Sequence, residues 1–169
     1  MRQRPQNRLN AQTSEFEELI VQINRVSKKT KGGNKVGFSA LTVVGNKKGK
    51  VGVGLGKAPD VAAAIRKGIS QAKKHLVDVP LVNGSIPFRI DIKLGAARIM
   101  LKPAPHGSGV IAGGSVRSVV TLAGIENISS KVLGTRNKIS NIYATLEALR
   151  RVSERGQKQK DRLEARGKN

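Results

Sequence analysis

The sequence predicts an α+β protein made of two small domains. Apolar residues first alternate with a period of two, which is typical of strands, then recur at helical spacing, and this change occurs in both halves of the chain. Between the halves, "VDVPLVNGSIP" at 77–87 combines two prolines with Asn-Gly, a pattern typical of a linker. We therefore expect a basic flexible arm at residues 1–15, a first domain at 16–79, a second domain at 80–152 and a polar tail at 153–169.

The first domain is predicted to hold a three-stranded antiparallel sheet and one helix. The strands are expected at 18–26, 35–45 and 49–56, with "GNKKG" at 45–49 as a hairpin turn. The helix is expected at 59–76, because Pro59 suits its first turn and Asp60 its positive end. Its predicted buried stripe consists of Val61, Ile65, Ile69, Ala72 and Leu76.

The stretch "KVGVGLGKAPDVAAAIRKG" at 50–68 resembles a phosphate-binding loop but fits neither common template. The P-loop pattern needs glycine at 51 and a hydroxyl at 58, where the chain has Val51 and Ala58. The dinucleotide pattern needs a third glycine where Lys57 stands. The strict period of two predicts a strand instead, with a bare glycine face that another segment can approach closely. No nucleotide or other cofactor is expected.

The second domain begins with a predicted hairpin, "FRIDIKLGAARIML" at 88–101, which turns near Gly95. A short helix follows, with Ser115 as its cap and Gly124 as its stop, and then a strand near 127–133. The last helix is expected at 139–153, where Ile142, Leu146 and Leu149 share one face. The polar residues after it are interpreted as a mobile tail or a segment that orders on a partner.

Charge indicates the class of partner. The chain has 32 Lys+Arg against 11 Asp+Glu, a formal net charge of +21, which favours a polyanion such as nucleic acid. No apolar run is long enough to span a membrane, and the first residues lack the apolar region of a secretory signal. The chain has no cysteine, so thiolate chemistry and disulfides are excluded and no metal site is expected.

The positive charge is concentrated in the first domain. Residues 19–59 contain no acidic side chain. The cations there are the candidate RNA-binding residues Arg25, Lys28, Lys29, Lys31, Lys35, Lys47, Lys48, Lys50 and Lys57. The alternative is that each is only a solvated lysine or arginine. Because the chain has three Phe, one Tyr and no Trp, base stacking is disfavoured, and contacts to the phosphates of folded, helical RNA are expected.

Several segments together resemble the bacterial-type small-subunit ribosomal protein five family. They are "NRVSKKTKGG", "FSALTVVGNKKGKVGVGLGKA", "GSGVIAGGSVRSV" and "NIYATLEAL", in one order over about residues 16–150. The resemblance implies a first domain similar to double-stranded-RNA-binding modules and a two-layer α/β second domain with a left-handed crossover. It also implies binding to small-subunit rRNA, stabilisation of the head of the subunit relative to its body, and a place in cytoplasmic or organellar ribosomes. Ribosomal proteins four and eight, and the path by which messenger RNA enters, would lie nearby.

The resemblance also implies roles for individual residues. "VSKKTKGG" at 26–33 matches the family's RNA-contacting loop, which is also associated with spectinomycin susceptibility; this adds Ser27, Gly32 and Gly33 to the candidate residues. The alternative is an ordinary flexible turn. Gly109 and Arg117 match the contact with protein four, where translational accuracy is influenced. Lys138 stands where the family commonly has proline, so the start of the last helix is expected to be less rigid.

Two alternatives to the ribosomal function are an enzyme and a free RNA-binding protein. An enzyme would need convergent groups, but His75 and His106 have no partner at recognisable spacing, and Asp78 and Asp91 are too far apart to suggest a metal cluster. The chain is therefore not expected to be an enzyme. The nearer alternative is a free regulatory protein that binds double-stranded RNA.

Overall fold

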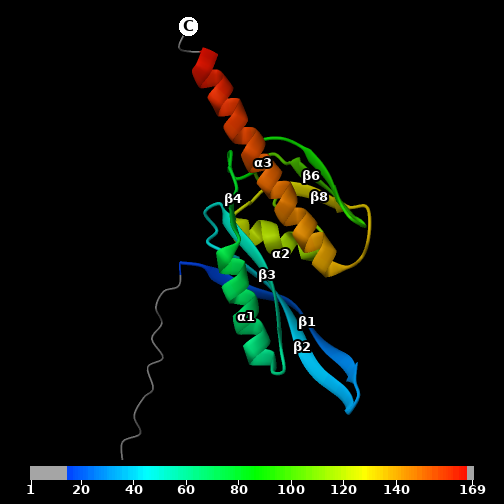
Figure 1. The fold of residues 1–169 in the computed structure, drawn as a ribbon. Coiled ribbons are helices and arrows are strands. Elements are labelled where there is room, and N and C mark those ends of the chain that lie inside the picture. Colours follow the sequence, from blue (N-terminus) through cyan, green and yellow to red (C-terminus); the bar gives the residue numbers. More distant parts are fainter. Residues whose placement is uncertain (1–14, 167–169) are drawn as a thin grey trace, which may run out of the picture.

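The computed structural model describes residues 15–166, so the predicted arm, apart from residue 15, and the last three residues lie outside the described part of the chain. Within residues 15–166 the chain forms two four-stranded sheets and three α-helices (Figure 1). The predicted α+β class with two sheet-based halves is confirmed.

The first sheet has the order β1-β2-β3-β4, and every neighbouring pair is antiparallel. Its strands are β1 (Glu17–Thr30), β2 (Gly33–Gly45), β3 (Lys50–Ala58) and β4 (Leu76–Asp78). The first three confirm the predicted strands, and a turn does occupy the expected place between β2 and β3. The prediction of a three-stranded sheet is wrong, because Leu76 pairs with Gly52 in a fourth strand instead of ending the helix. At three residues, β4 is too short to show a periodicity.

Helix α1 (Val61–Lys74) covers the glycine face of β3. The Asp60 side chain accepts a hydrogen bond from the Ala63 N–H, 3.3 Å between heavy atoms, and so caps the helix. The buried residues of the helix are Ala64, Gly68 and Ala72, whereas Val61, Ile65 and Ile69 are only half-buried. Ala72 thus confirms one member of the predicted stripe, whereas its large members were misplaced, because small side chains are needed where the helix backbone meets a strand of glycines.

The opposite face of the first sheet packs on the second domain. Leu41, Val43, Val51 and Val53 belong to one hydrophobic core with the helices and strands of the second half. Backbone bonds fix the β2–β3 turn to the end of helix α2 (Gly114–Ala123): Lys47 N–H donates to the Leu122 carbonyl at 3.0 Å, and Gly49 N–H to that of Ala123 at 2.9 Å. The two halves thus share a core and fold against each other.

The second sheet has the order β5-β6-β8-β7 and is mixed. Its strands are β5 (Ile90–Leu94), β6 (Ala97–Pro103), β7 (Val110–Ile111) and β8 (Ile128–Val132). Strands β7 and β8 are parallel, and α2 connects them, which makes β7-α2-β8 a strand-helix-strand crossover. That this crossover is left-handed stays a prediction. Strand β7, with two residues, was not predicted from the sequence.

The ends of the helices differ from expectation in two places. The residue at the N-cap of α2 is Gly113 and no side chain caps the helix, so the predicted cap at Ser115 is wrong. Gly124 does stop α2, in the left-handed conformation with φ 84°. Helix α3 spans Lys138–Arg166, so its predicted end at 153 is wrong and its last turns project beyond both sheets (Figure 1).

Candidate nucleic-acid interface

The distal halves of β1 and β2 form a two-stranded ribbon that extends away from the rest of the molecule (Figure 1). Its pairing runs from Val26↔Gly37 to Thr30↔Gly33, so only Lys31 and Gly32 form the turn. The segment 26–33 is therefore mostly paired strand at the end of a hairpin, and the loop expected between strands at 18–26 and 35–45 is shorter than predicted. Gly33 supports the tight turn with φ 121°, and the Thr30 hydroxyl donates to the Gly33 carbonyl at 2.8 Å.

The cations of this ribbon are exposed. Within residues 15–166, the side chains that form no salt bridge include Arg25, Lys28, Lys29, Lys31 and Lys35. Lys28 and Lys35 lie directly opposite each other on the two strands. Like charges in this position destabilise a sheet, so the protein retains an arrangement that a bound polyanion would relieve.

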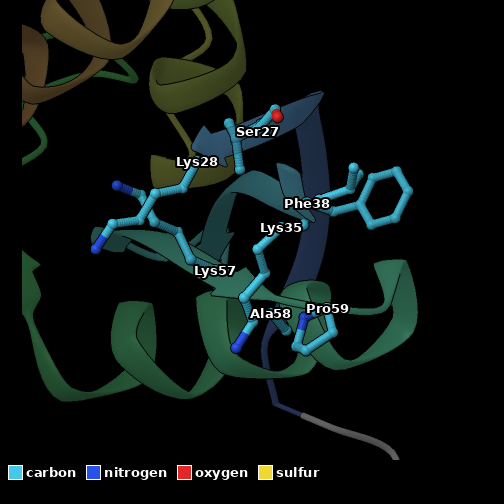
Figure 2. A pocket seen from close by; sticks show the side chains of 10 residues that line it. Ser27, Lys28, Lys35, Phe38, Lys57, Ala58 and Pro59 are labelled. Atoms are coloured by element: carbon cyan, nitrogen blue, oxygen red, sulfur yellow. The ribbon is translucent and has the colours of Figure 1, made fainter. Parts of the chain in front are cut away.

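A hollow of about 360 Å³ opens at the base of the ribbon, where β1, β2 and β3 meet (Figure 2). Its rim carries three lysines, one from each strand, and its wall includes apolar groups; the labelled residues are Ser27, Lys28, Lys35, Phe38, Lys57, Ala58 and Pro59. Lysine side chains around a shallow apolar floor supply point charges for phosphates, and hydroxyls such as that of Ser27 can contact sugar or phosphate.

The remaining predicted cations lie at the other end of the sheet. Lys47 and Lys48 belong to the β2–β3 turn and Lys50 is the first residue of β3; the turn is separated from the ribbon tip by the 13 residues of β2, or about 40 Å. Lys47 Nζ lies 2.7 Å from Glu17 Oε1, and Lys50 Nζ lies 3.9 Å from Asp78 Oδ1. The structure therefore divides the predicted residues into an unpaired ribbon cluster and a partly neutralised turn cluster.

The two candidate interface residues of the second domain lie close to each other. Arg117 on α2 is exposed, and its Nη2 donates a long hydrogen bond of 3.4 Å to the carbonyl of Val110, the residue after Gly109. The Gly109 N–H donates to Asn127 Oδ1 at 3.2 Å. Asn127, 3% exposed, was missed by sequence reasoning, since a buried asparagine beside a short strand leaves no periodic signal. Ile111, next to this pair, is a large apolar side chain that is 57% exposed.

The part of the chain that the structure describes lacks the features of a metal site and of a membrane-spanning helix. There, His, Cys, Asp and Glu residues form no cluster of three suited to a metal ion. His75 and His106 are both exposed on separate parts of the surface. In the same residues, no helix is long and apolar enough to cross a membrane.

Comparison with known protein families assigns both halves of the chain. Residues 16–80 match the N-terminal domain of ribosomal protein S5, and residues 92–162 match its C-terminal domain. This chain belongs to the ribosomal protein S5 family. The family resemblance inferred from the sequence is thereby confirmed, and because S5 is a family of ribosomal proteins and not of enzymes, so is the expectation that the chain is not an enzyme.

Individual relatives of this S5 chain cover most of its length. It is 54% identical over 137 residues to small ribosomal subunit protein uS5 of Thermosynechococcus vestitus, which covers 80% of this chain and 79% of that protein. It is 50% identical over 141 residues to the uS5 protein of Thermotoga maritima, covering 83% and 79% respectively.

Proposed function

We propose that the chain is a structural constituent of the small ribosomal subunit that binds small-subunit rRNA through the β1–β2 ribbon. The observation that supports this most strongly is the cluster of unpaired cations on an element that projects from the core. A projecting ribbon can contact RNA phosphates while the rest of the molecule contacts other components. In this role the chain would stabilise the head of the subunit relative to its body, close to the path by which messenger RNA enters.

The mode of RNA binding follows from the aromatic residues. Phe38 packs beside α1, Phe88 and Tyr143 pack against the main core, and Phe16 is half-buried as well, so all four rings of the chain are half-buried. Because none of these rings is fully exposed for stacking, affinity would come from phosphate and sugar contacts, which suits helical RNA. The cations Arg25, Lys28, Lys29, Lys31, Lys35 and Lys57 are proposed as the principal phosphate contacts, with Lys47, Lys48 and Lys50 contributing less.

The patch around Gly109 and Arg117 is proposed as the contact with ribosomal protein four. An exposed arginine beside the exposed side chain of Ile111 has the composition that favours a protein interface. Through this contact the chain would influence translational accuracy, and ribosomal protein eight is proposed as a second neighbour.

Reconstitution of small subunits tests the proposed function against a free regulatory protein. We expect the chain to co-sediment stoichiometrically with small subunits at moderate salt, and subunits lacking it to recover it from solution. A free regulator would bind isolated double-stranded RNA but compete poorly for assembly. Substoichiometric, salt-labile association with complete subunits would contradict the ribosomal role.

A further inference from the structure

Strand β1 is an edge of the first sheet. The sheet order is β1-β2-β3-β4, so β1 pairs with β2 on one side, and no strand among residues 15–166 pairs with its other side. Within the same residues, no other element carries as many exposed large apolar side chains; those of β1 are Leu19, Ile20, Ile23 and Val26, each at least 40% exposed. A long edge strand with exposed apolar side chains is a template for pairing with another strand.

The exposed apolar residues of β1 lie on both faces of the sheet. The register with β2 places Ile20 and Ile23 on the face that α1 covers, and Leu19 and Val26 on the opposite face. Between Ile20 and Gln22 the register shifts by one residue, so Val21 forms a bulge. A strand that pairs with this edge would therefore need apolar side chains on both of its faces.

The two ends of β1 carry opposite charges. Glu17 and Glu18 begin the strand, and Lys28 and Lys29 lie near its end. A second β1 strand laid antiparallel to the first would reverse this order. It would bring the acidic start of each copy to the basic end of the other, so a copy of the same strand is complementary in charge.

We propose that two copies of this chain pair through their β1 strands, antiparallel and about a twofold axis at Ile23. With the bulge residue Val21 left out of the register, the side chains that meet lie on the same face of the sheet. The matched pairs are Ile23 with the partner's Ile23, Val26 with the partner's Leu19, and Lys28 with the partner's Glu17. Each copy makes and receives the same contacts, as a twofold interface requires, and the two first sheets become one continuous sheet.

The pair formed by Lys28 and the partner's Glu17 would offset an unfavourable feature of the single chain. Within one copy, Lys28 lies opposite Lys35, and like charges in this position destabilise a sheet. Glu17 Oε1 lies 2.7 Å from Lys47 Nζ of its own copy, and a carboxylate can accept hydrogen bonds from a second lysine as well. The added carboxylate would therefore stand beside a cation that its own strand pair leaves in repulsion.

The net charge of the chain opposes this pairing at long range. Each copy carries a formal charge of +21, so two copies repel each other. At about 0.15 M salt the Debye length is about 8 Å, which screens this repulsion more strongly than the contacts inside the interface. Because Lys28 is also a proposed RNA contact, pairing is expected in the free chain and not in the subunit. Self-association itself does not depend on whether the ribbon binds RNA.

Two charge-reversal variants, Glu17→Lys and Lys28→Glu, test the register. Either change makes the contact between residues 17 and 28 repulsive, so each variant alone should sediment as single chains, whereas the mass of the native chain should rise toward two chains with concentration. An equimolar mixture of the two variants restores opposite charges at both contacts, and dimers should return. Residues 17 and 28 lie about 35 Å apart on one strand, so recovery on mixing cannot arise within one chain.

A further variant, Ile23→Lys, tests the apolar contact at the twofold axis, because it places two lysines opposite each other. Leu94→Lys is the matched control: Leu94 lies on β5, an edge of the second sheet, and is 42% exposed against 41% for Ile23. Ile23→Lys should abolish the dimer, and Leu94→Lys should leave it as in the native chain. Circular dichroism checks the fold of each variant, and if Ile23→Lys does not fold, the mixture of charge-reversal variants decides.

Several outcomes would overturn the proposal. The first is a native chain that sediments as one chain at every concentration tested. The others are a mixture of charge-reversal variants that forms no dimers, or lysine variants at Ile23 and Leu94 that dimerise equally, since another surface or register would then join the copies. RNA binding by the native chain is measured separately, so absence of dimers beside intact RNA binding leaves the proposed function standing.

Discussion

Gly54 of β3 lies directly against Gly68 of α1, so closely that a Cβ added to Gly54 would overlap the Gly68 carbonyl oxygen. A Cβ at Gly56 or Gly52 would likewise overlap a backbone carbonyl of the helix. The alternating glycines of "KVGVGLGK" therefore pack against the backbone of a helix and do not form a binding loop for a nucleotide phosphate. This contact fixes α1 on the sheet from which the ribbon projects.

Gly54→Val is expected to destabilise the fold by about 3 kcal/mol, because the added carbons meet backbone atoms that cannot rotate away. The built Cβ lies 2.7 Å from Ala72 N as well. Urea unfolding measures the change. Gly32→Ala is the matched control, since a Cβ there meets nothing within 4 Å. Equal midpoints for the two variants would show that α1 can move away from β3 at little cost.

Lys35→Glu is expected to change stability and RNA affinity in opposite directions. The new carboxylate would face Lys28 across the ribbon and replace a repulsive pair by an attractive one, which is worth about 0.2 to 1 kcal/mol. The same change removes a proposed phosphate contact and adds a negative charge, so RNA binding weakens. Thermal unfolding and RNA titration on the same preparation provide the comparison, and a variant that loses stability would disprove repulsion between Lys28 and Lys35.

Neutralising Lys28, Lys29 and Lys31 together is expected to flatten the salt dependence of RNA binding by about two to three units. These side chains lie at the exposed tip of the ribbon and form no ion pair within residues 15–166, so their loss should leave the fold intact. Filter binding at several salt concentrations gives the slope, and circular dichroism checks the fold. Lys93, Lys102 and Lys131, on the other domain, supply a control with the same change of charge. An unchanged slope in the ribbon variant would exclude the tip from the RNA-binding surface.

The sequence predicted those elements whose side chains repeat often enough to show a period. Strand β3 alternates glycine with apolar residues and was found, whereas β4 and β7, with three and two residues, carry no detectable pattern. The buried side of α1 was partly misplaced, because Ala64 and Gly68, which fit against the glycines of β3, give almost no hydrophobic signal. Short strands and contacts between small residues are decided by the tertiary structure.

The candidate site shows the same division. Charge along the chain identified the cations, but only strand register shows that Lys28 faces Lys35 while Lys47 lies near Glu17. The contact between the domains depends on backbone atoms, as in the bond from Lys47 N–H to the Leu122 carbonyl, and backbone atoms are common to every sequence. The hollow between β1 and the starts of α2 and α3 joins segments more than 90 residues apart, and its lining residues Arg136 and Asn141 belong to no motif.

Glu147 on α3 is expected to make stability depend on acid pH. Hydrogen bonds from Arg150, and also from Arg151, lower the pKa of this carboxyl from its ordinary value of 4.5. Because the folded state binds the proton less readily than the unfolded state, the pairing stabilises fully above the unfolded pKa and is lost as pH falls through the folded one. The stability difference between the native chain and Glu147→Gln, measured by urea unfolding, should therefore shrink from pH 6 to pH 3. Arg150→Gln should weaken this pH dependence, and a difference constant with pH would contradict the assignment.

Arg117→Leu is expected to separate accuracy from binding. Val116, Val119, Val120 and Ala123 form the buried side of α2, and Arg117 projects from the opposite side. The hydrogen bond that its side chain makes among the described residues is the long one to Val110, so folding and RNA affinity should change little. If the guanidinium instead bridges to ribosomal protein four, its loss alters how easily that interface opens when the subunit changes shape.

The size of the accuracy effect follows from the energy of a surface contact. An exposed ion pair is worth about 0 to 1 kcal/mol, and about 1 kcal/mol shifts a two-state equilibrium several-fold. Misreading and stop-codon readthrough in ribosomes reconstituted with Arg117→Leu should therefore change several-fold while incorporation stays complete. Arg117→Lys is the informative companion, because it keeps the charge but loses the planar fork that binds a carboxylate through two bonds. An intermediate error frequency would indicate a bidentate bridge, whereas native error frequencies in both variants would mean that Arg117 is only a solvated side chain.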